Sequence, residues 1–297
     1  MRLISVDDCS FDFLSSVFRF FKSRSFGSRG FSILPFFLEN STRTLVSFTE
    51  AASLCSSRII DFNLSTSSLS KGETDIETLK TCGMYSPNCV IFRTPNSGQT
   101  ALLAQYLPHN VHVINAGDGS NEHPTQAIGD LFTICDAYGI TDLSKSCLSG
   151  LEIAICGDVL NSRVARSNIK LLSKYGAKVH LVAPPCFLPQ ALSDYYKLTY
   201  GCIAHDDINE CFEFSDVVML LRIQKERAVS SGFQISKYSI KQHNIHKMKD
   251  KSFIMHPGPF NDGAEITQDI AYNNKKSLIL KQVESGLYTR AGILSAL

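Results

Sequence analysis

A Ser-Thr-Arg-Thr tetrapeptide, Ser41-Thr42-Arg43-Thr44, gathers several anion-binding groups in one short stretch. The apolar run 33–38 precedes it and the helix-like run 45–54 follows, so we expect the tetrapeptide at a helix N-terminus. Backbone N–H groups there lack partners inside the helix, and the helix dipole favours negative charge. The guanidinium of Arg43 adds a planar fork that suits a phosphate. The stretch therefore predicts a phosphate site, although a simple Ser or Thr cap would explain the same residues.

A second candidate is the stretch 115–126, which reads Asn-Ala-Gly-Asp-Gly-Ser-Asn-Glu-His-Pro-Thr-Gln. It follows a strand-like run at 111–114, and its two glycines permit left-handed backbone and close approach to a ligand. If a helix begins near Pro124, His123 and Gln126 lie at its start. A neutral imidazole and an amide there could both donate to one carbonyl oxygen. A loop histidine without a chemical role is the alternative.

The elements that must position these residues alternate between short β-like runs and helical runs, which favours parallel sheets covered by helices on both faces. Expected strands are Cys89–Phe92, Val111–Ile114, Glu152–Cys156, Lys178–Val182, Val217–Leu221 and Phe253–Met255. Ligands of such sheets bind beyond the carboxyl ends of the strands. Arg93 and Arg222 come directly after strand-like runs, and Gly157-Asp158 ends another, so we expect functional groups at these points.

The composition excludes several classes of protein. The 297 residues are enough for one large domain or two ordinary ones, and 29 basic against 28 acidic residues argue against a nucleic-acid-binding protein with a broad basic surface. The ten cysteines include no Cys-x-x-Cys pair and lie scattered in apolar runs, which predicts buried free thiols and a reducing cytoplasm.

A membrane location is not expected either. No stretch approaches the ~18 to 20 continuous apolar residues of a membrane span. The Phe-rich segment 11–21 has apolar residues at helical spacing and is preceded by Asp7 and Asp8, so it predicts an amphipathic helix rather than a signal peptide.

Seven motifs in order along the chain resemble those of the aspartate/ornithine carbamoyltransferase family. They are Ser41–Thr44, Lys71-Gly72-Glu73-Thr74, Arg93-Thr94-Pro95, the stretch 117–126, Ser162–Ser167, Arg222–Arg227 and His256-Pro257-Gly258-Pro259. The resemblance, like the alternation of elements, implies an α/β fold with two domains, each a parallel β-sheet flanked by helices. We expect a carbamoyl phosphate-binding domain at 1–142, an aspartate-binding domain at 151–280, and a C-terminal helix at 281–297 that packs back on the first domain.

The resemblance implies transfer of the carbamoyl group of carbamoyl phosphate to the amino group of L-aspartate, an early step of pyrimidine synthesis. No cofactor or metal is expected, because phosphate is a good leaving group. Residues matching the family's carbamoyl phosphate ligands are Ser41, Thr42, Arg43, Thr44, Arg93, His123, Gln126, Gly258 and Pro259. The resemblance implies catalytic roles for His123, Arg43, Thr44 and Lys71. His123 would be the principal donor to the carbonyl oxygen, where negative charge develops.

The family's aspartate ligands match Lys71, Arg163, Arg222 and Gln224. In the family, the loop that carries Ser67 and Lys71 reaches a neighbouring subunit's site, so the resemblance implies a homotrimer with shared active sites. Regulatory or dihydroorotase chains could enlarge that assembly. Without the resemblance, a Lys in a Ser-rich loop reads as a solvated surface residue.

Two departures from the family pattern are visible. Leu45 replaces a second Arg, and Asp262 replaces an Arg after the His-Pro-Gly-Pro turn, where the charge reversal could change a domain contact. The turn lacks the Cys of the ornithine enzymes, which favours aspartate as the acceptor. A carbamoyltransferase with another amino-acid acceptor and a catalytically inactive binding homologue remain as alternatives.

Overall fold

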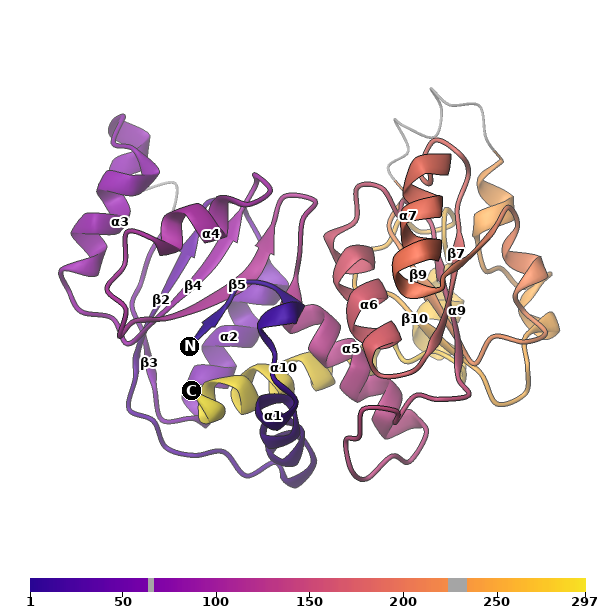
Figure 1. The fold of residues 1–297 in the computed structure, drawn as a ribbon, viewed down its shortest axis with the longest axis horizontal. Coiled ribbons are helices and arrows are strands. Elements are labelled where there is room, and N and C mark those ends of the chain that lie inside the picture. Colours follow the sequence, from indigo (N-terminus) through magenta and orange to yellow (C-terminus); the bar gives the residue numbers. More distant parts are fainter. Residues whose placement is uncertain (64–66, 224–233) are drawn as a thin grey trace. The chain divides into compact units, whose positions relative to one another are not determined.

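Two five-stranded sheets organise the chain, and their strands pair in parallel (Figure 1). The computed structural model describes residues 1–63, 67–223 and 234–297. The first sheet has the order β1-β5-β4-β2-β3, with strands β1 (Arg2–Leu3), β5 (His112–Asp118), β4 (Cys89–Thr94), β2 (Ser32–Phe37) and β3 (Arg58–Ile59). The second has the order β10-β9-β6-β7-β8, with strands β10 (Phe253–Met255), β9 (Val217–Leu220), β6 (Glu152–Cys156), β7 (Lys178–Val182) and β8 (Ile203–His205).

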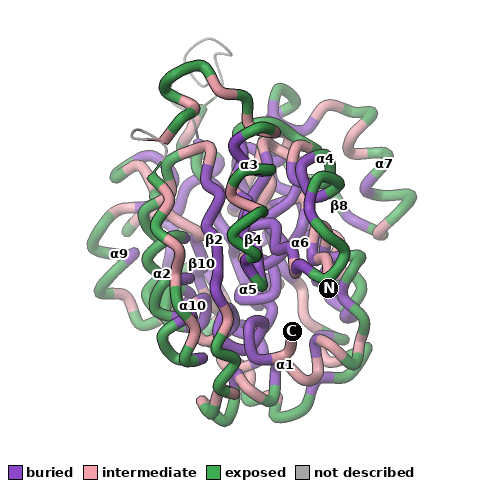
Figure 2. The backbone as a smooth tube through the Cα atoms, turned by 90° about the vertical axis from the view of Figure 1, so that its left-hand side faces the viewer, coloured by how far each residue is buried: buried purple, intermediate pink, exposed green. Residues whose placement is uncertain are grey.

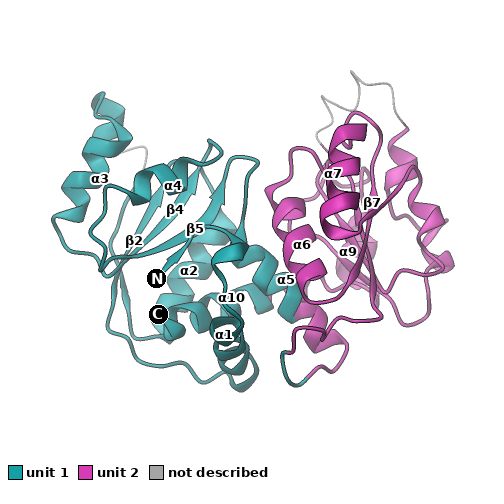
Figure 3. Ribbon diagram, in the orientation of Figure 1, with its two compact units in different colours: residues 1–132, 141–143, 285–297 teal, residues 133–140, 144–284 magenta. Residues whose placement is uncertain are grey.

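Each sheet belongs to its own compact unit (Figure 3). Residues 1–132, 141–143 and 285–297 form the first unit, and residues 133–140 and 144–284 form the second. The helices are α1 (Phe11–Ser23), α2 (Thr42–Leu54), α3 (Asp75–Gly83), α4 (Gln99–Ala104), α5 (Pro124–Ala137), α6 (Arg163–Lys174), α7 (Gln190–Tyr200), α9 (Gln268–Asn273) and α10 (Ile279–Ala296). The fold predicted from the alternation of elements, two domains built on parallel sheets, is confirmed.

The six predicted strands are all present, and most residues of each are buried, as expected for strands in the interior of parallel sheets. The buried strands β2 and β4 stand out from the largely exposed helix α7 in Figure 2. The edge strands β1, β3 and β8 were not predicted. They are only two or three residues long, and β3 and β8 carry exposed residues.

Helix ends follow ordinary capping chemistry. Ser10 accepts from the N–H of Phe13 at the start of α1, which buries Phe18 and Phe21 as the amphipathic pattern predicts. Both rings contact Phe132, with centroids 4.9 and 5.3 Å away. Helix α5 begins at Pro124, where a proline costs no intrahelical hydrogen bond.

The C-terminal helix packs on the first unit, as predicted. It lies beside α1 and α2 in Figure 1, and a Cβ added at Gly292 would lie 3.0 Å from the carbonyl oxygen of Val17. The thiol of Cys55 donates to the carbonyl oxygen of Ala291 over 3.3 Å. Small residues let the backbones approach closely here, so the last turns of the chain are part of the first unit's core.

All ten cysteines are free thiols, and seven of them are buried. Burial raises the pKa of Cys89 to about 12, so this thiol stays protonated and behaves as an apolar core residue. Within the described residues, no helix is both long and apolar enough to cross a membrane.

Candidate functional site

Two of the predicted phosphate-binding segments of the first unit lie at a topological switch point of its sheet. From β2 the chain continues to the edge strand β3, whereas from the neighbouring β4 it continues to β5 on the other side. The loops therefore diverge beyond the carboxyl ends of β2 and β4, and ligands of parallel sheets bind in such a crevice. Ser41–Thr44 follows β2 and Arg93 lies at the end of β4, so the fold places both predicted phosphate ligands there.

The phosphate loop does not use its serine as an ordinary helix cap. Ser41 is the N-cap of α2, but its side chain makes no capping hydrogen bond. Its hydroxyl instead donates to Oγ1 of the buried Thr44 over 2.9 Å. Ser41 thus occupies the cap position of the Ser or Thr cap that the sequence left open, but its side chain does not make the capping hydrogen bond. Thr42 and Arg43 are exposed at the same helix end, where backbone N–H groups favour an anion.

Arg93 is held in place from two sides, by the loop after β2 and by strand β5. Its Nε donates to Oε1 of Glu39 over 2.5 Å, and its Nη1 donates to the carbonyl oxygen of Ala116 over 2.9 Å. Phe37 pairs with Arg93 across the sheet. The side chain is only 12% exposed. The guanidinium is thus oriented before any ligand arrives, which lowers the entropy cost of binding one.

The turn after β5 is fixed by a buried carboxylate. Asp118 accepts from the side chain of Asn115 over 2.9 Å, from the N–H of Gly98 over 2.8 Å and from the N–H of Glu122 over 3.1 Å. Gly119 has a φ of +50°, and a Cβ there would lie 2.4 Å from the backbone nitrogen of Ser97. Only glycine fits this close approach, so the Gly-Asp-Gly sequence serves to hold the turn.

That turn delivers His123 and Gln126 to the start of α5. His123 is buried, and its Nδ1 lies 3.5 Å from the hydroxyl of Thr125. The amide nitrogen of Gln126 donates to Oδ1 of Asp130, one turn further along, over 2.8 Å. A carboxylate only accepts, so the nitrogen of the amide must face Asp130. This bond uses one of the two N–H groups of the amide, so the carbonyl oxygen of Gln126 is left as an acceptor and the second N–H as a donor, and the predicted donor role stays a prediction.

Lys71 lies apart from these residues in the contacts of the described chain. It ends the short 3-10 helix Ser68–Lys71 and is exposed, and Gly72 after it is left-handed with a φ of +95°. No hydrogen bond or ion pair that joins Lys71 to the phosphate loop occurs among residues 1–63 and 67–223.

The second unit repeats the arrangement at its own switch point, between β6 and β9. Arg163 is the first residue of α6, which Ser162 caps by accepting from the N–H of Ala165 over 3.1 Å. Arg222 is exposed and follows β9 directly, since the N–H of Leu221 still donates to the carbonyl oxygen of Cys156 over 2.7 Å. The fold thus places both predicted aspartate ligands beyond adjacent strands of one sheet. Gln224 lies outside the described residues.

The Gly258-Pro259 turn follows β10 and is tied to the segment after Arg222. The side chain of Asn261 donates to the carbonyl oxygen of Ile223 over 2.8 Å. The N–H of Gly258 donates to Nδ1 of the buried His256 over 2.8 Å. These bonds bring the turn beside one predicted aspartate ligand within the second unit.

The two departures from the family pattern, Leu45 and Asp262, have local explanations. Leu45 is 36% exposed, so no buried partner is lost by the absence of an arginine there. Asp262 accepts from the N–H of Gln268, the first residue of α9, over 2.9 Å. Its carboxylate thus stabilises a helix start, which an arginine could not do.

Sequence reasoning missed Glu39, Asp118 and Asp130, which orient the predicted ligands. Asp130 was visible in the pattern, because it stands four residues after Gln126 on one helix face. Glu39 meets Arg93 only through the pairing of β2 with β4, which no local pattern gives.

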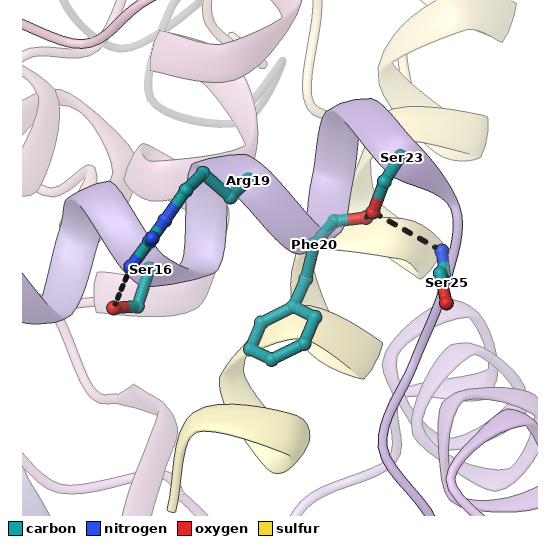
Figure 4. Close-up of a pocket in the computed structure, with 5 residues that line it drawn as sticks. All are labelled: Ser16, Arg19, Phe20, Ser23 and Ser25. Atoms are coloured by element: carbon teal, nitrogen blue, oxygen red, sulfur yellow. Dashed lines mark hydrogen bonds between the residues drawn. The ribbon is translucent and has the colours of Figure 1, made fainter.

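A surface hollow of about 410 Å³ lies elsewhere, along α1 (Figure 4). Its lining consists of Ser16, Arg19, Phe20, Ser23 and Ser25. It contains none of the predicted ligands, and its polar groups bond to one another, Arg19 to Ser16 and the N–H of Ser25 to Ser23. We therefore place the candidate site at the switch points and not in this hollow.

Known proteins resemble this chain in both sequence and fold. A model of the aspartate/ornithine carbamoyltransferase carbamoyl-P binding domain matches residues 12–136, and one of the Asp/Orn binding domain matches residues 149–297. The aspartate carbamoyltransferase catalytic subunit of Solibacter usitatus is 41% identical over 270 residues, which are 90% of this chain and 85% of that protein. The corresponding subunit of Ehrlichia ruminantium (strain Gardel) is 42% identical over 275 residues, covering 90% of this chain and 86% of its own.

Among solved structures, aspartate transcarbamoylase from Trypanosoma cruzi in complex with carbamoyl phosphate and aspartate matches with a TM-score of 0.85 and 27% identity. The match covers 100% of this chain and 95% of that one. Together, the two family models span every strand of the two sheets except β1, and they contain all the motifs of the candidate site. The chain belongs to the aspartate/ornithine carbamoyltransferase family.

Proposed function

We propose that the chain is an enzyme that transfers the carbamoyl group of carbamoyl phosphate to the amino group of L-aspartate. The products are N-carbamoyl-L-aspartate and phosphate, as in de novo synthesis of the pyrimidine UMP. The observation that carries the proposal is the gathering of Ser41–Thr44 and Arg93 at one switch point, in the unit that also holds His123 and Gln126. The relatives named aspartate carbamoyltransferase support the choice of acceptor.

The first unit would bind carbamoyl phosphate, as predicted for residues 1–142. The N-terminus of α2 supplies N–H groups and the hydroxyls of Ser41, Thr42 and Thr44 to the phosphate. Arg43 and Arg93 supply charge-assisted hydrogen bonds, which are about twice as strong as neutral ones. The bonds from Arg93 to Glu39 and Ala116 favour this role because they hold the guanidinium ready.

The carbonyl carbon is where the amine attacks. A bond forms between the amine nitrogen and this carbon, the bond from carbon to the phosphate oxygen breaks, and the leaving phosphate takes the amine's proton. Negative charge grows on the carbonyl oxygen in between, and His123 would donate to it, assisted by Thr44 and Arg43. One well-placed donor of this kind contributes about 3 to 4 kcal/mol. The carbonyl oxygen of Gln126 and the backbone carbonyls at Gly258 and Pro259 would accept from the carbamoyl NH₂.

L-Aspartate would bind through the second unit, as predicted for residues 151–280. Its two carboxylates need cations, and Arg163 and Arg222 stand beyond the ends of neighbouring strands. Gln224 and Lys71 complete the proposed set. No metal or organic cofactor has a step in this scheme.

We propose a cytoplasmic homotrimer with shared active sites. Lys71 is the residue that bears on the assembly. Its exposure on the first unit fits a residue that serves a neighbouring subunit. Mixing Lys71→Ala with His123→Ala chains tests this: hybrid trimers should regain activity that neither variant has alone. A mixture as inactive as its components would contradict shared sites. Regulatory or dihydroorotase chains would show as a larger species on co-purification.

The direct test is an assay of the purified chain with carbamoyl phosphate and L-aspartate, in which the ureido group of the product is measured. Binding of inorganic phosphate is measured in parallel by calorimetry. Product formation supports the proposal. Phosphate binding without any product would favour the inactive binding homologue instead.

A further inference from the structure

A buried arginine in the C-terminal helix lies close to the proposed phosphate site but belongs to none of the matched motifs. Arg290 is 5% exposed, although arginines are almost never fully buried without a partner. Two glycines make room for it. A Cβ at Gly286 would lie 2.7 Å from Nη1 of Arg290, and a Cβ at Gly129 would lie 3.5 Å from Cα of Gly286. Helices α5 and α10 thus approach closely at glycines, and the Arg290 side chain lies back along α10 over Gly286.

The contacts of Arg290 connect α10 to the helix that begins with the phosphate loop. Its Nη1 donates to Oγ of Ser47 over 2.9 Å, and its guanidinium carbon lies 5.3 Å from the ring centroid of Phe48. Ser47 stands one turn after Thr44 on α2. Among the described residues, Nε of Arg290 has no hydrogen-bond partner. One neutral hydrogen bond and one ring face do not by themselves offset the cost of burying a cation, so the charged groups around Arg290 matter for its stability.

The charges around Arg290 are those of the site itself. Its pKa is lowered to about 10 as the net result of burial, which lowers it most, of Asp130, which raises it, and of Arg93, which lowers it. Arg290 is therefore within electrostatic reach of both Asp130, which holds the amide of Gln126, and Arg93, a proposed phosphate ligand. In a buried, weakly screened setting such a charge acts over a longer distance than at the surface.

We propose that Arg290 is a positioning residue for carbamoyl phosphate. It fixes α2 through Ser47, it fixes Gln126 through the charge of Asp130, and it adds buried positive potential beneath the dianionic phosphate. The idea rests on the proposed function, because it names a further residue of the same site. It also explains why the last turns of the chain carry a buried cation where an apolar residue would pack at less cost.

The test compares Arg290→Met, which keeps much of the side chain's volume, with Arg290→Lys, which restores the charge. Thr289→Val is the matched control, because Thr289 is buried on the same helix and its hydroxyl has no hydrogen-bond partner among the described residues. For each purified chain, the Kd for inorganic phosphate, the KM values for both substrates and the melting temperature are measured. If Arg290→Met does not fold, Ser47→Ala removes the acceptor on α2 instead.

We expect Arg290→Met to weaken phosphate binding by about 10-fold or more, as for loss of a charged hydrogen-bond partner. The KM for carbamoyl phosphate should rise equally, while the KM for L-aspartate changes by less than about 2-fold and Thr289→Val changes nothing. Arg290→Lys should recover most of the loss. A lower melting temperature with unchanged phosphate Kd and KM would overturn the proposal and leave a structural role. A wild-type chain that binds phosphate but makes no product would refute the proposed function alone, since the phosphate series would still report on Arg290.

Discussion

The Nε of Arg93 donates to Oε1 of Glu39 over 2.5 Å, and this bond joins the end of β4 to the loop after β2. The phosphate loop begins two residues after Glu39. An acidic residue beside a phosphate site repels the ligand, so its presence needs a reason. Here the carboxylate orients a guanidinium that would otherwise be mobile, so Glu39 and Arg93 lie at the switch point as an ion pair.

Replacing Glu39 should therefore weaken the site instead of strengthening it. Glu39→Ala removes the acceptor from Nε of Arg93, and we expect kcat/KM for carbamoyl phosphate to fall about 10-fold, as for a charge-assisted hydrogen bond. Glu39→Gln keeps an oxygen acceptor and should lose less. Steady-state kinetics decide the matter, and tighter binding of carbamoyl phosphate by Glu39→Ala would show that repulsion outweighs orientation.

His123→Ala should lower turnover much more than it weakens phosphate binding. A donor aimed at the carbonyl oxygen acts mainly in the transition state, and its loss costs about 3 to 4 kcal/mol, or ~100- to 1000-fold in kcat. The comparison is between kcat and the calorimetric Kd for inorganic phosphate. Equal losses in both would rule out the polarising role and make His123 a structural or phosphate-binding residue.

Gly157→Ala should destabilise the second unit. Gly157 has a φ of +127°, and a Cβ there would lie 2.8 Å from the carbonyl oxygen of Leu221, the residue before Arg222. The clash and the backbone strain together should cost about 2 to 4 kcal/mol of unfolding free energy, measured by urea denaturation. Gly150→Ala is a matched control, since Gly150 also has a positive φ but no atom within 4 Å of an added Cβ. Equal losses of unfolding free energy in the two variants would show that backbone strain alone, and not the contact with Leu221, causes the destabilisation.

Asp262→Ala should lower stability without affecting catalysis. The carboxylate accepts from the N–H of Gln268 at the start of α9, and loss of such a cap costs about 1 kcal/mol. Asp262→Asn keeps an acceptor and should be close to wild type. A change in kcat/KM larger than about 3-fold in Asp262→Ala would instead show that Asp262 affects catalysis, for example through the domain contact that the charge reversal could change.

His180 should make the second unit less stable in mild acid. Burial lowers its pKa below that of an exposed histidine, and the hydrogen bond from its Nε2 to Glu152 offsets this only in part. The unfolded chain therefore takes up a proton first. Stability from the neutral ring is present above the unfolded pKa of about 6.5 and is lost as the pH falls towards the folded pKa.

The check is the free energy of unfolding at about pH 7.5 and pH 5 for wild type and His180→Gln. The difference between the two pH values should be smaller in the variant, while His246→Gln, at an exposed histidine, should match wild type. If His180→Gln enlarges the difference, the ring is charged in the folded protein, and the contact with Glu152 dominates over burial.

The fold was largely predictable because parallel strands buried on both faces are continuous apolar runs, as at β4 and β9. The start of α2 was less predictable from the sequence. The helix begins at Thr42, three residues before the apolar pattern starts at Leu45, because Thr and Arg do not mark a helical face. The order of the strands was not predictable at all. The switch points were therefore not predictable either, and they explain why Ser41–Thr44 and Arg93 lie at the ends of neighbouring strands.

The ligand types of the candidate site could be read from the sequence, but the residues that orient them could not. Arg93 and His123 stand next to strand and helix signals. Glu39 bonds to Arg93, which is 54 residues further along the chain, and Arg290 bonds to Ser47 across the interface of α10 with α2. Only the folded chain brings these partners together.

The most direct measurement is the fate of the carbamoyl carbon. Carbamoyl phosphate labelled with ¹³C is incubated with the purified chain and an equimolar mixture of L-aspartate and L-ornithine, and the products are resolved by NMR. We predict that the label appears in N-carbamoyl-L-aspartate at a rate well above the uncatalysed one, with none in citrulline. Label in citrulline, or only in the products of spontaneous breakdown, would contradict the assignment of this chain as a carbamoyltransferase that acts on aspartate.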